Sequence, residues 1–368
     1  MLIFKYIESI NLLYNKKYDL VFYSESKNYN KLFYPLVKNL SKKKEIKILY
    51  ASSDEKDKLF LDNVENLFIG KGFILSILFN LINAKVLITT TTDLGNNLLK
   101  KNNNKKNYVY LFHSPVSVHK FYTKNAFDNY DYIFCNGEYQ LIELKKLENL
   151  NKSKEKIYRK TGYLYFDYLN LYKNENKNNQ ILIAPSWNFK KENFTSLNSL
   201  KLIQNLLSNT NYKIIFRPHP EQIKRDSEAI KHIKNLFCDN ENFFLDLSTN
   251  NTKFLKNSDL IITDYSGIAL EFIMIFKRPA IFVNDIPKIH NKEFQKISQN
   301  TIEDDIKSKF GYQLKPKDLN QIEKHVQIAL KNFDLKKKLI DEYLIDNFYN
   351  FGSSIKYTSE EILKILDQ

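Results

Sequence analysis

The chain has 368 residues, 43% of them hydrophobic and 14% aromatic, which is enough to build two packed domains rather than one. Its formal net charge is +14, but lysine and asparagine are abundant throughout, so basicity alone does not indicate a nucleic-acid-binding protein. No apolar run is long enough to cross a bilayer, and the start lacks the pattern of a signal peptide. Cys135 and Cys238 form no recognisable pair, which favours a reducing cytoplasm.

The first half of the sequence alternates short apolar strands with helices. Residues 1–14 carry apolar side chains at helical spacing, a stripe that packs on the core or lies on a membrane. We expect strands at 19–24, 45–51, 66–70, 85–90, 108–112 and 131–136, and helices at 30–40, 73–83 and 138–147. Short buried strands with helices between them are typical of a parallel sheet.

Residues 172–180 are rich in Asn and Lys and predict a linker, after which the alternation resumes. We expect strands at 181–184, 213–216, 243–247, 259–263 and 279–284, and helices at 196–207, 221–236, 252–255 and 267–276. Two or three helices at 317–366 should brace both lobes. The predicted fold is α/β, with Rossmann-like domains at 1–171 and 181–316 facing a cleft and bridging helices at 317–368, an arrangement called GT-B.

The sequence at 258–272 is the most informative stretch. An apolar strand ends in a polar turn, and Ser266 and Gly267 then open an apolar helix. The backbone N–H groups of Gly267 and Ile268 at such a helix start are predicted to bind a pyrophosphate. Glu271, about one turn further on, is placed to reach a ribose hydroxyl. The alternative is an ordinary strand-to-helix corner with Ser266 as the N-cap.

Two other predicted strands also end in polar residues. His113 follows the strand at 108–112, and Arg217 and His219 follow the strand at 213–216. Ligands of open α/β sheets bind beyond the carboxyl ends of the strands. We predict His113 as the general base, Arg217 as a fork for the donor phosphates, and His219 as an imidazolium that stabilises the leaving nucleotide. One such histidine alone would more often be a polar turn residue.

Several motifs are absent from the sequence. It has no Walker A motif, no Gly-x-Gly-x-x-Gly, no Asp-x-Asp and no Cys/His cluster with zinc spacing. We therefore expect no metal and no cofactor, with the nucleotide entering as part of an activated donor substrate. Asp264 is expected beside the diphosphate, where it either orients His219 or holds the turn.

The chain resembles the CDP-glycerol glycerophosphotransferase family, the teichoic-acid and capsule polymerases and primases of GT-B-like fold. The motifs that carry the resemblance are His113, Thr161-Gly162-Tyr163, Ala184-Pro185-Ser186-Trp187, Arg217-Pro218-His219-Pro220, Ser258-Asp259, Thr263-Asp264-Tyr265-Ser266 and Lys277-Arg278-Pro279. The resemblance implies a donor such as CDP-glycerol or a related CDP-alditol, a polysaccharide or lipid-linked acceptor, and no nucleic acid. It also implies a peripheral place on the anionic inner face of the cell membrane.

The sequence departs from the family pattern at three places. The family usually has His-Gly-Thr where this chain has His113-Ser114-Pro115, a second Ser in place of Gly267, and Asp in place of Glu271. Ser-Gly followed by Glu is closer to nucleotide-sugar glycosyltransferases of the same fold. Two alternatives therefore stay open: a GT-B glycosyltransferase for capsule or lipooligosaccharide, and a non-catalytic binder of anionic polymer.

Overall fold

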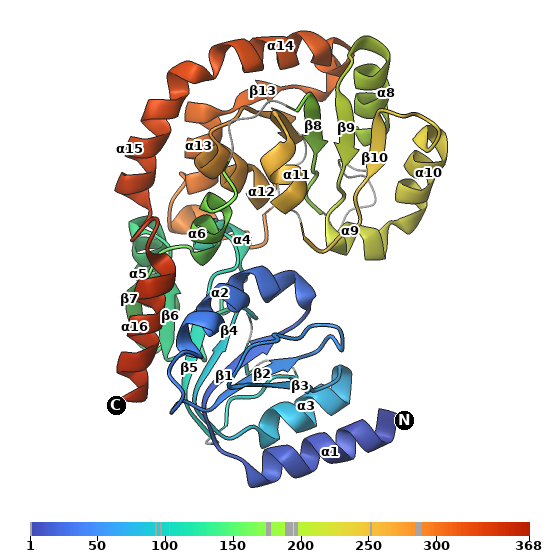
Figure 1. The fold of residues 1–368 in the computed structure, drawn as a ribbon. Coiled ribbons are helices and arrows are strands. Elements are labelled where there is room, and N and C mark those ends of the chain that lie inside the picture. The colour runs from blue at the N-terminus through green and yellow to red at the C-terminus, as the bar shows by residue number, and fades with distance from the viewer. Residues whose placement is uncertain are drawn as a thin grey trace.

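The computed structural model describes residues 2–92, 94–95, 98–102, 104–173, 178–187, 194, 198–250, 252–283 and 289–368. The chain forms two α/β domains, one above the other (Figure 1). Of the three C-terminal helices, the first crosses the top of the C-terminal domain, and the next two run down one side towards the N-terminal domain. Each domain has its own parallel sheet, so the predicted α/β class with two Rossmann-like halves is confirmed.

The N-terminal sheet has seven parallel strands in the order β3-β2-β1-β4-β5-β6-β7. These strands are β1 (Tyr18–Ser24), β2 (Ile48–Ser52), β3 (Val64–Phe68), β4 (Ala84–Thr89), β5 (Lys105–Leu111), β6 (Tyr132–Cys135) and β7 (Ile157–Lys160). Its helices are α1 (Leu2–Asn15), α2 (Asn30–Leu40), α3 (Gly72–Leu81), α4 (Val118–Phe121), α5 (Glu138–Asn151) and α6 (Leu164–Asn170). The strand order reverses between β1 and β4, where folds of this kind open a crevice.

The C-terminal sheet has six parallel strands in the order β10-β9-β8-β11-β12-β13, with its reversal between β8 and β11. These strands are β8 (Gln180–Ile183), β9 (Lys213–Phe216), β10 (Phe243–Leu245), β11 (Leu260–Thr263), β12 (Ala280–Val283) and β13 (Tyr312–Leu314). Its helices are α8 (Ser199–Asn209), α9 (Pro220–Arg225), α10 (Ser227–Phe237), α11 (Thr252–Asn257), α12 (Gly267–Glu271) and α13 (Ile302–Phe310). The C-terminal arm consists of α14 (Ile322–Asn332), α15 (Lys337–Asn347) and α16 (Ser354–Leu366).

The structure departs from the predicted elements in several places. The helix predicted at 221–236 is two helices, because the backbone leaves the helical region at Asp226, with φ −135° and ψ 52°. The helix predicted at 267–276 continues after α12 as a π-helical turn, η2 (Phe272–Phe276). Strands β7 and β13 and helices α4, α6 and α13 were not predicted. Cys238, which its apolar neighbours in the sequence predict to pack as a small hydrophobic residue, is exposed. The predicted linker lies partly, at 174–177, outside the described residues.

Alternate side chains of the C-terminal strands enter two different cores, as the two-residue period of a strand requires. On β11, Leu260 and Ile262 join a core with residues of α8 and α14, whereas Ile261 points to the opposite face. The core on that face is continuous with the core of the N-terminal domain, and it includes every residue of η2. One apolar core therefore crosses from one domain into the other.

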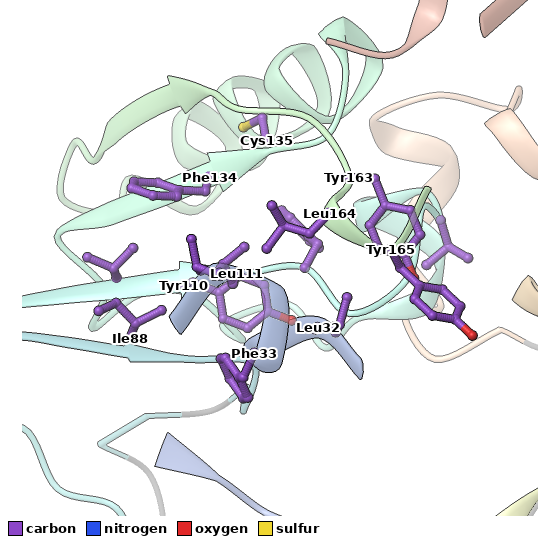
Figure 2. Close-up of a cluster of buried hydrophobic side chains, with 14 of the residues drawn as sticks. Leu32, Phe33, Ile88, Tyr110, Leu111, Phe134, Cys135, Tyr163, Leu164 and Tyr165 are labelled. Atoms are coloured by element: carbon purple, nitrogen blue, oxygen red, sulfur yellow. The ribbon is translucent and has the colours of Figure 1, made fainter. Parts of the chain in front are cut away.

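Figure 2 shows the N-terminal part of this shared core. Side chains from α2, β4, β5, β6 and α6 meet there, and those labelled are Leu32, Phe33, Ile88, Tyr110, Leu111, Phe134, Cys135, Tyr163, Leu164 and Tyr165. Tyr163 and Tyr165 lie at one end of the group. Both rings are almost fully buried, so the segment that leads into α6 is fixed by packing as well as by hydrogen bonds.

The C-terminal arm returns to the N-terminal domain through α16, which packs on α2 and α6. The Asp167 carboxylate accepts hydrogen bonds from the Gly352 and Ile355 backbone N–H groups, at 2.9 and 3.1 Å, at the start of α16. Gly162 faces the same junction with φ +91°, and an added Cβ would lie 2.2 Å from the Tyr349 carbonyl oxygen. Glycine is therefore required where the two segments meet.

A second junction joins the two domains beside α4. Glu303, at the start of α13, accepts a hydrogen bond from the Ser117 backbone N–H. Burial raises the pKa of the Glu303 carboxyl from about 4.5 to about 7, and the nearby Glu143 carboxylate also raises it. The folded protein therefore holds a proton on Glu303 at pH values where the unfolded chain has released it.

We predict that Glu303→Gln flattens the dependence of stability on pH. A carboxyl whose folded pKa is raised makes the free energy of unfolding fall as pH rises from about 4.5 to about 7. At about 1.4 kcal/mol per pKa unit, the variant should gain up to about 3 kcal/mol over the parent above pH 7 and little below pH 5. Denaturant unfolding at several pH values measures this difference, with the exposed Glu342→Gln as the control. Parallel pH profiles for parent and Glu303→Gln would contradict the raised pKa.

Candidate active site

A cleft of about 840 Å³ lies between the two domains, at the carboxyl ends of strands from both sheets. Seven of the eight predicted site residues line it: His113, Arg217, His219, Ser266, Gly267, Ile268 and Glu271. The eighth, Asp264, does not. The structure therefore brings residues that are up to 158 positions apart in the sequence into one cleft.

His113 follows β5 and enters the cleft from the N-terminal domain. Its ring meets the Tyr29 ring edge to face, with 5.4 Å between the ring centroids, and the Tyr122 ring at 6.4 Å. Its backbone carbonyl accepts a hydrogen bond of 2.9 Å from the Tyr163 hydroxyl. Aromatic rings and a backbone bond thus fix the direction of the imidazole.

Arg217 follows β9 and enters the cleft from the C-terminal domain, already paired. Its guanidinium forms an ion pair with Asp246, which is 2% exposed, and donates to the Ser248 carbonyl at 2.8 Å. Asp246 follows β10, the strand next to β9, so the pair joins two adjacent strand ends. The pair orients the guanidinium and reduces the positive charge that Arg217 presents to the cleft. The sequence analysis did not predict this pair.

His219 is the N-cap of α9. Its Nδ1 accepts a hydrogen bond of 3.1 Å from the Glu221 backbone N–H, and Pro220 occupies the first helical position. An imidazole that accepts at Nδ1 carries its proton on Nε2 and is neutral. The predicted imidazolium would have to break this cap, so the geometry favours a neutral His219 that donates through Nε2–H.

Ser266 and Gly267 open α12 at the edge of the cleft. Ser266 stands at the N-cap position with extended backbone, φ −81° and ψ 133°, but its side chain makes no capping hydrogen bond. The alternative of an ordinary N-cap serine therefore lacks the bond that would define it. The hydroxyl stays available to a group in the cleft.

Two of the departures from the family pattern touch one another across the cleft. A Cβ added at Gly267 would lie 2.5 Å from the Ser114 side-chain oxygen. Where the family usually pairs Gly after the histidine with a second Ser on the helix, this chain has Ser114 and Gly267. The total side-chain volume at this contact is conserved, with the larger residue moved to the other domain.

We predict that Gly267→Ser is destabilising and that Ser114→Gly rescues it. The single variant overpacks the contact and should lose about 1–3 kcal/mol of unfolding free energy. The double variant restores the usual arrangement and should recover most of the loss. A double-mutant cycle by denaturant unfolding measures the coupling between the two positions. Independent, additive effects would show that the two departures are unrelated.

Asp264 holds the turn after β8. Its carboxylate accepts hydrogen bonds from the Ser186 backbone N–H and the Ser186 hydroxyl, both at 2.7 Å. Of the two roles predicted for Asp264, holding a turn is the one for which the structure shows contacts. The turn it holds begins Ala184-Pro185-Ser186, which lines the cleft.

Glu271 is 5% exposed and faces the N-terminal domain. Its Oε1 lies 2.8 Å from the Tyr163 hydroxyl, the same hydroxyl that lies 2.9 Å from the His113 carbonyl. The Tyr163 hydroxyl thus faces two acceptors, the Glu271 carboxylate and the His113 backbone carbonyl. Burial raises the pKa of Glu271, whereas the nearby Lys31 and the hydrogen bond from Tyr163 lower it.

Sequence reasoning did not assign three residues that line or support the cleft. Lys31 of α2 has its Nζ 3.9 Å from the centre of the Tyr165 ring, and burial lowers its pKa. Trp187 has its ring 6.2 Å from that of His219. Trp187 could have been assigned from the sequence, because it is the only tryptophan and belongs to the motif Ala184-Pro185-Ser186-Trp187. Tyr163 belongs to the motif Thr161-Gly162-Tyr163, but only the fold shows which groups it contacts, and Lys31 carries no signal of its own.

The described residues contain no group of three or more His, Cys, Asp or Glu side chains placed to hold a metal ion. Within those same ranges, no helix is both long and apolar enough to span a membrane.

The sequence model of one protein family matches residues 6–291, which include both domains' cleft residues. The chain belongs to the CDP-glycerol:poly(glycerophosphate) glycerophosphotransferase family. A search of proteins with curated functions finds no match.

Solved structures show the same fold at low identity. The wall teichoic acid polymerase TagF matches with a TM-score of 0.65 and 15% identity, over 100% of this chain and 95% of TagF. UDP-GlcNAc 2-epimerase from Neisseria meningitidis, bound to UDP-GlcNAc, matches with 0.61 and 12% over 94% and 100%. MnaA from S. aureus with UDP matches with 0.58 and 10% over 94% and 95%. These matches establish a GT-B-like fold.

Proposed function

We propose that the protein transfers glycerol phosphate, or a related alditol phosphate, from a CDP-activated donor to a hydroxyl of a surface polysaccharide or lipid-linked acceptor. The observation that carries the proposal is the cleft, which has His113 on one domain and Arg217, His219 and Ser266 on the other. Family membership supports the donor class. A TagF variant with a similar fold was soaked with CDPG.

In the proposed reaction, the acceptor hydroxyl oxygen attacks the phosphorus that carries the glycerol. The new P–O bond forms as the bond to CMP breaks, and CMP leaves. His113 takes the hydroxyl proton, while the guanidinium of Arg217 and the Nε2–H of His219 stabilise charge on the phosphate oxygens. The nucleotide serves as the leaving part of a substrate, so the proposal assigns no resident cofactor or metal.

Product analysis tests the donor. Incubation with CDP-glycerol and a hydroxylated acceptor should release CMP and extend the acceptor, whereas UDP-sugars should give no product. His113→Ala should lower the transfer rate by about 10²–10⁴-fold with CDP affinity nearly unchanged, because only the proton acceptor is lost. His232→Ala, at an exposed position on α10, is the matched control. A rate within a few-fold of the parent would remove His113 from the mechanism.

The two alternative functions predict different results in the same assay. A nucleotide-sugar glycosyltransferase is favoured by Glu271, which replaces the family's usual Asp, and sugar transfer from a UDP- or GDP-sugar would establish it. A non-catalytic binder of anionic polymer would retain polymer without donor and turn over none of these nucleotides.

We predict that Glu271 contributes to ribose binding and Ser266 to diphosphate binding. Glu271→Gln should weaken CMP and CDP alike, while Ser266→Ala should weaken mainly CDP. Each lost bond to a charged partner costs about 1.5–3 kcal/mol. Calorimetry with both nucleotides measures the difference, and Tyr163→Phe separates loss of the hydroxyl contact from loss of the carboxylate. Parent-like affinity of Glu271→Gln for both nucleotides would show that the carboxylate does not hold the ribose.

We also propose that the protein works in the cytoplasm at the inner face of the cell membrane. The outer side of α1 exposes Ile7, Ile10 and Tyr14, and the neighbouring α3 exposes Phe73, which is 77% exposed. With a net charge of +14, these residues support interfacial binding to anionic lipid. Liposome sedimentation at low and high salt tests it, and equal binding to neutral and anionic vesicles would contradict an electrostatic contribution.

A further inference from the structure

The chain that follows His113 leaves the N-terminal sheet and lies against the C-terminal domain. Ser117 donates its backbone N–H to Glu303, and its side-chain oxygen accepts from the Ile302 N–H at 3.0 Å. Lys120 pairs with Asp304 at 2.8 Å. Residues 117–120, which we call the tether, are thus bonded to the start of α13.

Loop 290–298 of the C-terminal domain bonds to the other side of the tether. The Lys120 carbonyl accepts from the His290 N–H at 3.0 Å and from the Asn291 N–H at 3.3 Å. The Phe294 ring packs 6.2 Å from the His119 ring. The C-terminal domain therefore surrounds the tether on two sides.

His119 lies at the centre of the tether and is 0% exposed. Its Nδ1 is 3.1 Å from Glu143 Oε2, in the N-terminal domain, and its Nε2 is 3.1 Å from the Ser298 carbonyl oxygen, in the C-terminal domain. A carbonyl only accepts hydrogen bonds, and Glu143 Oε2 already accepts from the Val118 N–H at 2.6 Å. Nε2 therefore bonds to the Ser298 carbonyl, whereas Nδ1 lies close beside the Glu143 carboxylate without forming a hydrogen bond to it.

The chain segment between His113 and the tether is short, and side chains of α5 hold it by hydrogen bonds. The Pro115 carbonyl accepts from the Tyr139 hydroxyl at 2.9 Å, and the Val116 carbonyl accepts from the Gln140 side chain at 3.0 Å. His113 lies only four residues before the tether begins. His113 and the tether thus belong to one short segment that is hydrogen-bonded along its length.

We propose that His119 is a positioning residue, whose hydrogen bond to Ser298 and close contact with Glu143 tie the loop of His113 to the C-terminal domain. The base then keeps its distance from the donor phosphates when the two domains move relative to each other. The proposal rests on the proposed role of His113 as the base, and it goes beyond that role by naming what sets the position of His113. His119 itself does not line the cleft.

Two substitutions test the role of His119. His119→Phe keeps a ring against Phe294 and donates no hydrogen bond, while the milder His119→Gln keeps one donor and serves if the first variant fails to fold. Misplacing a catalytic group by about 1 Å can cost on the order of 100-fold in rate. We expect transfer to fall 10- to 100-fold with CDP affinity within about two-fold of the parent. The exposed His232→Gln is the matched control.

A double-mutant comparison separates positioning from general destabilisation. If His119 acts through His113, the substitution should cost almost nothing in a His113→Ala background, because the group it positions is gone. A loss of equal size in both backgrounds would overturn the proposal.

Hydrogen exchange gives a readout that does not depend on any donor. The Ser117 and Val118 amides, both bonded to carboxylates in this structure, should exchange at least ten-fold faster in the His119 variants, while amides of β1 should not change. Unchanged exchange at 117–118 would overturn the proposal even if CDP-glycerol is the donor. Faster exchange would support the role of His119 in holding the tether, even if the donor proves to be a nucleotide sugar.

Discussion

The burial of η2 between the two domains is the constraint on which the cleft depends. Its five residues are at most 4% exposed, and they belong to the apolar core that is continuous with the N-terminal domain. Because α12 runs directly into η2, this packing fixes α12 with its first residues at the edge of the cleft. Removal of apolar surface from water thus determines where polar groups face the substrate.

Polar contacts then refine what the apolar core positions. Arg217 is oriented by Asp246, His219 by a backbone N–H, and Glu271 by Tyr163. Each group reaches the cleft with its direction already set, so little side-chain entropy remains to be lost when a ligand binds. This pre-organisation also limits the positive charge that faces the cleft, because Arg217 is paired with Asp246 and the His219 Nδ1 accepts a backbone hydrogen bond.

Much of the fold could be predicted from the sequence, because central strands of a parallel sheet are short continuous apolar runs. The strands that escaped prediction lie at the sheet edges, where β7 reads Ile157-Tyr158-Arg159-Lys160 and has no buried residue. The cleft positions of His113, Arg217 and Ser266 followed from strand ends. Their partners did not, because Asp246 and Tyr163 become neighbours of these groups only through the sheet order and the domain junction.

The return of α16 to the N-terminal domain has a consequence for biosynthesis. The Tyr132 hydroxyl of β6 bonds to Gln368 at 2.8 Å, and Arg159 of β7 pairs with Glu361 at 2.8 Å, so the first domain is discontinuous along the chain. A ribosome that has released residues 1–171 has not yet made the helix that covers α2. The first domain to be synthesised is thus the last to be completed, and it must wait with an apolar face uncovered, available to a chaperone, while the second domain forms. Protease resistance of nascent chains stalled before and after α16 would show whether this order holds.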